Sequence, residues 1–252
     1  MKYLKRYKLF ENYSRWGSKK IEESEFNSLF SKNCKNYSEE NTRIFRGMNY
    51  IGDFVFIDPK KGDIRSSIEY TNIHIDLIDD LPSWKDYPKY SKCVIGITDK
   101  AGSSSYGSTI YEVIPYDNSK IAVCPEPTIW ESFSDEFGGW GDYIYLVDYF
   151  FGEFGINNVN KLKSIGNITS NLSYPGEVSD TMLFLERLGK KIKIKIEDIT
   201  GLDCFNFIND YLFNPDERGF ELLNYTRGFE ANNYKQVWTD GPVLMKKIVK
   251  KY

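Results

Sequence analysis

The chain has 252 residues, of which 41% are apolar and 27% charged, and its formal net charge is −3. An aromatic share of 16% excludes a disordered chain, because disordered chains lack the apolar surface that a core requires. No run approaches the roughly 20 apolar residues of a membrane-spanning helix. The lysine- and arginine-rich start at 1–8 is unlike a secretory signal, so we expect a cytoplasmic protein.

Histidine and cysteine usage restricts the chemistry. A single histidine, His74, excludes multi-histidine metal centres, and the four cysteines are too widely spaced for a paired-cysteine zinc site. We therefore expect four reduced thiols, at Cys34, Cys93, Cys124 and Cys204, and no metal. Any catalysis would rest on Arg, Glu, Asp, Ser and Tyr side chains.

The first half of the chain predicts one helix followed by short strands. Residues 18–34 predict the helix, with Ser18 as its cap and Ile21, Phe26, Leu29 and Phe30 on one face. Runs rich in β-branched and aromatic residues predict strands at 42–48, 54–57, 93–98, 109–114 and 120–124. The polar turn at 116–119 predicts a hairpin between the last two. His74 is interpreted as a half-buried strand residue at 72–75, and Trp84 as a loop anchor packed on the core.

The second half mixes both kinds of element. We expect strands at 143–151, 191–196 and 243–249, helices at 179–188 and 203–213, and a long exposed loop at 157–175. Strands and helices do not alternate regularly, which favours an α+β fold with a twisted, mostly antiparallel sheet. We expect one domain, with an N-terminal helical segment (1–40), a core (41–140) and a C-terminal α/β extension (141–252). The alternative is two domains divided near Gly138-Gly139.

One constellation of residues indicates a site. Arg46 lies among apolar strand residues at 44–48, where an anion is the expected partner of its planar guanidinium. Further on, the strand at 93–98 ends in Thr98, and a segment of small residues follows at 101–107. The strand at 120–124 then leads to two glutamates, Glu126 and Glu131.

This order resembles the mono-ADP-ribosyltransferases of the arginine–serine–glutamate class, over residues 44–133. Ile97-Thr98-Asp99 stands where that family has Ser-Thr-Ser, and glutamates five residues apart replace its closely spaced acidic pair. The resemblance implies an ADP-ribosyltransferase-type sheet that forms an NAD cleft. It also implies cleavage of the nicotinamide–ribose bond of NAD and transfer of ADP-ribose to an acceptor, without a metal.

The resemblance also implies roles for single residues. Arg46, with Gly47 beside it, would hold the diphosphate of NAD, and Thr98 would position Arg46 or the glutamate. Tyr106 or Tyr111 would stack on nicotinamide. Glu126 or Glu131 would stabilise the ribosyl cation, and Glu131 is favoured because Pro125 and Pro127 hold Glu126 in an extended turn.

Two other functions stay open. Residues 65–92, through Arg65-Ser66-Ser67, Thr71-Asn72 and the run 82–91, are also similar to uncharacterised proteins of tailed bacteriophages, a resemblance that names no activity. The aromatic-rich surface and the acidic stretch fit a non-enzymatic phage-encoded binding protein, such as a host-factor inhibitor or a virion component. The third hypothesis is a nucleic-acid binder that uses the basic ends, Lys2–Lys20 and Lys246–Lys251. Residues 121–160 carry acidic side chains and no Lys or Arg, so a protein acceptor is favoured over nucleic acid.

Overall fold

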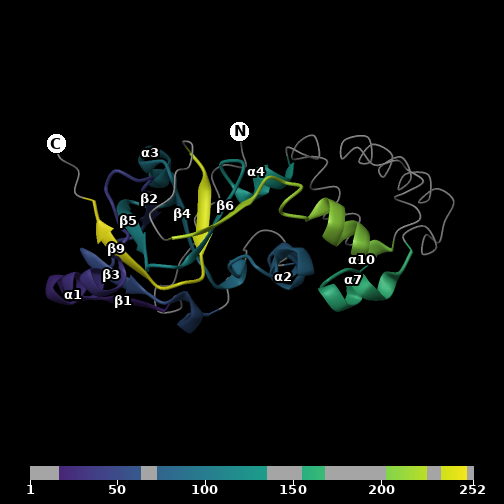
Figure 1. Ribbon diagram of the computed structural model, residues 1–252, viewed down its shortest axis with the longest axis horizontal. Helices are drawn as coiled ribbons and strands as arrows, with labels where there is room; N and C mark the ends of the chain where they lie inside the picture. Colours follow the sequence, from purple (N-terminus) through teal and green to yellow (C-terminus); the bar gives the residue numbers. More distant parts are fainter. Residues whose placement is uncertain (1–16, 64–72, 135–154, 168–202, 226–233, 249–252) are drawn as a thin grey trace. The chain divides into compact units, whose positions relative to one another are not determined.

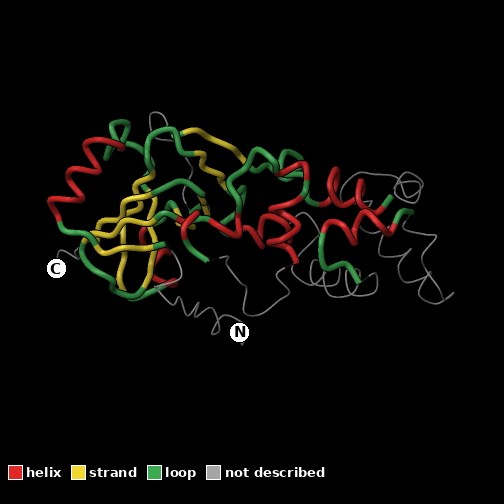
Figure 2. The backbone as a smooth tube through the Cα atoms, turned by 90° about the horizontal axis from the view of Figure 1, so that it is seen from below, coloured by secondary structure: helices red, strands yellow, loops and turns green. Residues whose placement is uncertain are grey.

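The computed structural model describes residues 17–63, 73–134, 155–167, 203–225 and 234–248. They divide between two compact units. Unit 1 comprises residues 1–70, 87–127 and 221–252, and unit 2 comprises 71–86 and 128–220. Figure 1 labels the elements, and Figure 2 colours helices, strands and loops; the strands of the described ranges all belong to unit 1. The elements expected at 143–151, 179–188 and 191–196 and the glycine-rich 137–141 lie outside the described residues.

The strands of unit 1 form one sheet. Among the described residues, nine strands follow one another in the order β1-β3-β9-β5-β2-β4-β8-β6-β7, and the paired neighbours are antiparallel. They are β1 (Ser18–Lys20), β2 (Ile44–Met48), β3 (Phe54–Ile57), β4 (Val94–Ile97), β5 (Thr109–Pro115), β6 (Lys120–Val123), β7 (Glu221–Asn224), β8 (Gln236–Thr239) and β9 (Val243–Lys247). The predicted α+β class with a mostly antiparallel sheet is confirmed.

Helical elements complete both units. Unit 1 holds α1 (Glu23–Asn33), α3 (Lys100–Ser103) and the short 3-10 turns η2 (Pro59–Lys61), η4 (Tyr90–Lys92) and η5 (Ser104–Tyr106). Unit 2 holds α2 (Ile73–Asp80), η3 (Pro82–Trp84), α4 (Ile129–Ser134), α7 (Val159–Ile165), α10 (Cys204–Asn206) and the π-helical η8 (Phe207–Leu212). The last two confirm the helix predicted at 203–213.

The two faces of the sheet bury different clusters. One face carries Ile44, Val113 and Met245 from three neighbouring strands, together with Tyr111. The other face carries Ile114 and Leu244, which pack with Phe26 of α1. Because side chains alternate along a strand, β3, β5 and β9 contribute to both clusters. β9, predicted as a closing strand, lies between β3 and β5 inside the sheet.

Two predictions in unit 1 are wrong. Residues 18–20 are not helical: they form β1, which pairs Ser18 with Ile57, and the helix begins only at Glu23. The turn at 116–119 closes with Ser119 N donating to Tyr116 O at 3.1 Å, but it makes no hairpin. β5 pairs with β2 and β9, whereas β6 pairs with β7 and β8. Local patterns predict strands, but strand partners depend on contacts far apart in the sequence.

Two predictions in unit 2 are also wrong. The residues around His74 form α2 rather than a strand, and the buried Ile75 and Ile78 of this helix are three residues apart, as on one helix face. Part of the expected loop at 157–175 is α7, which Asn158 caps by accepting a hydrogen bond from Lys161 N at 2.8 Å. Residues 168–175 lie outside the described part.

Trp84 anchors η3 in unit 2, as predicted. It is 2% exposed, and its indole Nε1 donates to Phe213 O at 2.5 Å. The rings of Phe220 and Phe133 lie edge-on to it, with centroids at 5.0 and 6.2 Å. An indole whose single donor is bonded and whose faces are covered supports packing rather than ligand binding.

The cysteines are all free and buried. Burial raises the pKa of Cys34 and of Cys204 to about 12, with a smaller contribution from Asp117 and Asp203, respectively. We expect a thiol reagent at pH 8 to label the native chain slowly and the urea-unfolded chain at four sites.

The pKa of Cys34 and of Cys204 is higher in the folded chain than in the unfolded chain. The free energy of unfolding should therefore fall as pH rises from about 9 towards 12. Rapid labelling of Cys34 and Cys204 in the native chain would contradict their burial and their raised pKa values.

Candidate functional site

The two strands that carry the predicted signals are neighbours. β2, with Arg46, lies beside β4, which Thr98 follows. β2 pairs with β5 along its whole length, from Ile44 to Met48, but its register with β4 consists of Phe45 opposite Ile97. The ladder between β2 and β4 is therefore short, so few main-chain hydrogen bonds join these two neighbouring strands.

Arg46 connects these strands. Its side chain is 7% exposed, and Nη1 of the guanidinium donates to Ile95 O on β4. In the register with β5, Arg46 stands opposite Tyr111, whereas Phe45 stands opposite Glu112. Because successive side chains point to opposite faces, Arg46 and Glu112 lie on different sides of the sheet. Glu112 is therefore not the carboxylate partner of Arg46.

Gly47 allows α3 to lie on β2. A Cβ atom at Gly47 would stand 1.9 Å from Ser103 O, so that no larger residue fits without moving the helix. Gly107, at the end of the same small-residue segment, is in equally close contact with Met48: its Cβ would meet Met48 Cα at 2.4 Å. The glycines at 47 and 107 thus bring the segment 100–107 onto the strand that carries Arg46.

Thr98 extends the ladder from β4 to β8. Its N–H donates to Lys235 O at 3.0 Å, and its Oγ1 accepts from Lys235 N at 2.9 Å. These bonds join Thr98 to the residue before β8 and not to Arg46. Next to Lys235, Gln236 stands opposite Ile97 and donates through its amide to the Tyr90 hydroxyl at 3.1 Å.

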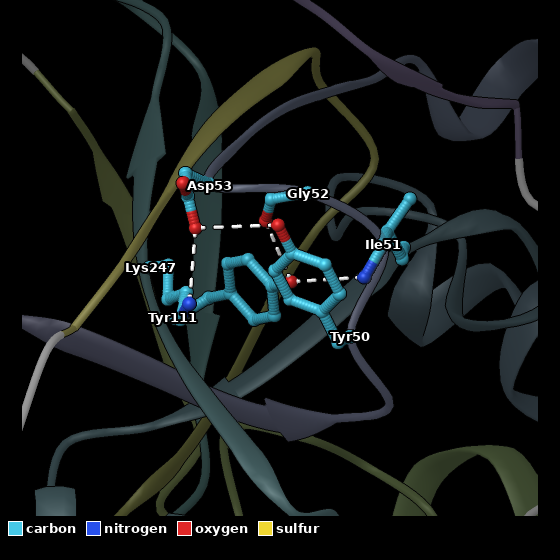
Figure 3. Close-up of polar contacts among 6 residues, drawn as sticks. All are labelled: Tyr50, Ile51, Gly52, Asp53, Tyr111 and Lys247. Atoms are coloured by element: carbon cyan, nitrogen blue, oxygen red, sulfur yellow. Dashed lines mark hydrogen bonds and ion pairs between the residues drawn. The ribbon is translucent and has the colours of Figure 1, made fainter.

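The two predicted stacking tyrosines have opposite environments. Tyr111 is fully buried, and its hydroxyl donates to Gly52 O at 2.8 Å and accepts from Ile51 N at 3.1 Å (Figure 3). Its ring belongs to the core and offers no face to a ligand. Tyr106, in η5, is 41% exposed. Of the two, Tyr106 is the side chain that can stack on a bound ring.

The two predicted glutamates belong to different units. Glu126 follows β6 in unit 1 and is half-buried. β4 and β8 lie between β2, which carries Arg46, and β6, which precedes Glu126. At about 4.8 Å per strand spacing, β2 and β6 are roughly 14 Å apart along the sheet. Glu131 is exposed in the first turn of α4 in unit 2, where its N–H donates to Thr128 Oγ1 at 3.0 Å. Neither glutamate lies on β2, on β4 or on a strand paired with them.

The sequence prediction missed a buried carboxylate. Glu112, 5% exposed in the middle of β5, accepts hydrogen bonds from Arg43 Nε and Nη2, both at 2.5 Å, and from the Tyr37 hydroxyl at 2.7 Å. Burial and then the bond to Glu112 raise the pKa of Tyr37 well above its usual value. The bond to Glu112 also raises the pKa of Arg43. The available signal was a carboxylate within an otherwise apolar strand, Ile110-Tyr111-Glu112-Val113.

Within the described ranges, no group of three or more His, Cys, Asp or Glu residues is arranged to hold a metal ion. Nor does any helix of those ranges have the length and apolar character needed to cross a membrane. Comparison of the chain with protein-family models, with curated proteins and with solved structures finds no match.

Proposed function

We propose that unit 1 has an ADP-ribosyltransferase-type fold and binds NAD where β2 meets β4, and that the chain is a mono-ADP-ribosyltransferase-like protein. One observation carries the proposal. The segments 44–48 and 93–98, far apart in the sequence, lie side by side in the sheet, and the Arg46 guanidinium extends from one to the other. These are the segments on which the resemblance to the transferases rests.

The proposed binding roles follow from the placement of the residues. Arg46 would hold the diphosphate of NAD, for which a planar guanidinium is suited. The Cβ direction of Gly47 is opposite to that of Arg46, so the segment 100–107 packs on the other face of β2, and Tyr106 would have to reach the nicotinamide ring past the end of the strand. Thr98 would contribute indirectly, because its bonds to Lys235 hold the end of β4 against the start of β8.

The proposed reaction needs a carboxylate and no metal. The bond between ribose C1′ and the nicotinamide nitrogen breaks, and its electron pair neutralises the pyridinium as nicotinamide leaves. C1′ becomes an oxocarbenium-like centre, which Glu126 or Glu131 would stabilise. A nucleophile of the acceptor then bonds to C1′ and loses its proton. The acidic stretch 121–160 favours a protein as acceptor, and the resemblance of residues 65–92 favours action in the cytoplasm of a phage host.

Replacement of Arg46 by lysine tests the binding role. Arg46→Lys keeps the positive charge and a donor for Ile95 O but loses the planar fork, so we expect NAD affinity to fall about tenfold with the fold retained. Arg43→Lys is the matched control, because Arg43 pairs with Glu112 on the other face of the sheet. Calorimetric titration with NAD measures both variants. Equal affinities of Arg46→Lys and the wild type would contradict the role of Arg46.

The alternative function is a non-enzymatic phage-encoded binding protein. It differs from the transferase in one measurable respect, because it requires neither NAD binding nor release of nicotinamide. A chain that binds a macromolecule in a defined stoichiometry and leaves NAD intact would favour this alternative. The exposed aromatic side chains of unit 1, Tyr50, Tyr106 and Tyr234, are the feature of the structure that supports a macromolecular partner.

A further inference from the structure

The sheet of unit 1 is strongly curved, because a short turn joins two of its strands that are not neighbours. In the strand order, four spacings of about 4.8 Å, or roughly 19 Å, separate β5 from β6. The turn at 116–119 nevertheless joins Pro115 to Lys120, and its bond from Ser119 N to Tyr116 O keeps these strand ends within about 15 Å of each other. A flat sheet cannot satisfy this connection, so β4, β8 and β6 curve back towards β2, β5 and β9.

The curvature encloses the face of the sheet that carries Arg46. Side chains from both parts of the sheet join one buried cluster, with Val113 of β5 on one side and Val94 of β4 and Val237 of β8 on the other. Ile44 belongs to the same cluster, and Arg46 follows it by two residues on β2, so both side chains point to the enclosed face. The Arg46 guanidinium is therefore buried on the inner side of the curved sheet.

The contact between β2 and β4 is the weakest ladder of the described sheet. Its register has one pair, Phe45 opposite Ile97, whereas each of the other neighbouring strand pairs has two or more. The second link is the bond from Arg46 Nη1 to Ile95 O. We name these two links, Phe45–Ile97 and Arg46–Ile95, the β2–β4 seam.

The strands on either side of the seam are held independently of it. β2 keeps a register of five pairs with β5, and β4 keeps one of four pairs with β8. At the seam itself, Gly96 permits a close approach, since a Cβ there would meet Ile44 Cγ2 at 2.4 Å and Phe45 O at 3.0 Å. A glycine of this kind often marks a corner of a curved sheet. The seam can therefore part while the ladders on both sides stay intact.

We propose that the β2–β4 seam is a gate for NAD: Arg46 holds it closed through Ile95 O and, when the strands part, turns its guanidinium to the diphosphate. This inference rests on the proposed function. A bidentate phosphate contact needs two N–H groups of the guanidinium, and the bond to Ile95 O engages Nη1, so the closed seam and the diphosphate compete for Arg46. NAD then binds the open form, and its apparent affinity falls in proportion to the fraction of molecules that are open.

A disulfide across the seam tests the gate. Residues opposite each other in an antiparallel pair have the Cα separation that a disulfide spans, so Phe45→Cys/Ile97→Cys should lock the seam when oxidised. We expect the oxidised form to bind NAD at least about tenfold more weakly than the same variant after reduction with dithiothreitol. Val113→Cys/Met245→Cys, across the full ladder of β5 and β9, is the matched control, and its oxidised and reduced forms should agree within about twofold.

The calorimetric outcomes distinguish the gate from the NAD site. Equal NAD affinities of the oxidised and reduced Phe45→Cys/Ile97→Cys variant would overturn the gate and leave the NAD site in place. An absence of NAD binding to the wild type would overturn the proposed function, and with it NAD as the ligand of the gate.

Opening of the seam is measurable without NAD. Ile97 and Val113 are 3% and 4% exposed, so the single variants Ile97→Cys and Val113→Cys place equally buried thiols at the seam and within a continuous part of the sheet. At pH 8, iodoacetamide should label Ile97→Cys at least about tenfold faster than Val113→Cys, as followed by peptide mass spectrometry. Equal labelling rates would show that the seam does not open and would overturn the proposal.

Discussion

Replacing Glu112 by alanine should lower the free energy of unfolding by about 2–3 kcal/mol, less than the loss of one partner from a fully buried ion pair, because the Arg43 side chain is 36% exposed. The carboxylate accepts both bonds of the Arg43 guanidinium and the bond of the Tyr37 hydroxyl. Its loss leaves a half-buried cation and a phenol without that acceptor. It also releases the residues between α1 and β2 from β5, because Tyr37 and Arg43 both belong to that connection. Urea unfolding followed by circular dichroism measures the effect.

Glu221 provides the matched control. It is an exposed glutamate on the edge strand β7, so Glu221→Ala should change the free energy of unfolding by no more than about 0.5 kcal/mol. A loss below about 1 kcal/mol in Glu112→Ala would show that Arg43 and Tyr37 satisfy their donors elsewhere once the carboxylate is removed.

The second large effect concerns turnover of NAD. We expect Glu126→Gln to lower the rate of nicotinamide release at least about a hundredfold while NAD binding stays nearly intact, because the carboxylate interacts mainly with the cation that develops in the transition state. The structure moves our preference from Glu131 to Glu126. Glu126 shares unit 1 with Arg46, whereas the exposed Glu131 lies in the first turn of α4 in unit 2, where its N–H donates to Thr128 Oγ1.

Glu131→Gln is the comparison for this experiment. It keeps the length of the side chain and the helix start, and we expect it to release nicotinamide at the wild-type rate. Single-turnover assays with saturating NAD measure both variants. A loss confined to Glu131→Gln would contradict the assignment to Glu126, and equal rates in all three proteins would show that neither glutamate acts on the cation.

Much of the strand content could be predicted from the sequence, because the local signals are strong. Phe54–Ile57 forms the predicted strand, and the strand predicted at 109–114 extends by one residue to Pro115. Their β-branched and aromatic residues, bounded by turn formers, match a pleated half-buried surface. The pairing of these strands could not be predicted in the same way. β9 inserts between β3 and β5, and β8 separates β4 from β6, and all four of these pairs join residues more than one hundred positions apart.

The candidate site was predicted in part for the same reason. Arg46 and Thr98 could be assigned to strands, because Arg46 lies among apolar strand residues and Thr98 ends an apolar run, but their expected proximity came from the resemblance to the transferases. The burial of Tyr111 and the capping role of Thr128 before Glu131 depend on which elements cover them, which a single strand pattern does not contain. Tyr50 and Tyr234 could not be singled out from the sequence, because 19 tyrosines are spread along the chain and only the fold separates the exposed ones from the buried ones.

Calorimetric titration of the full wild-type chain with NAD is the most direct test of the proposed function. If the Arg46 guanidinium between β2 and β4 binds the diphosphate, the titration should show one saturable site with a dissociation constant below about 1 mM. The absence of saturable heat at millimolar NAD would contradict an NAD site at the junction of β2 and β4.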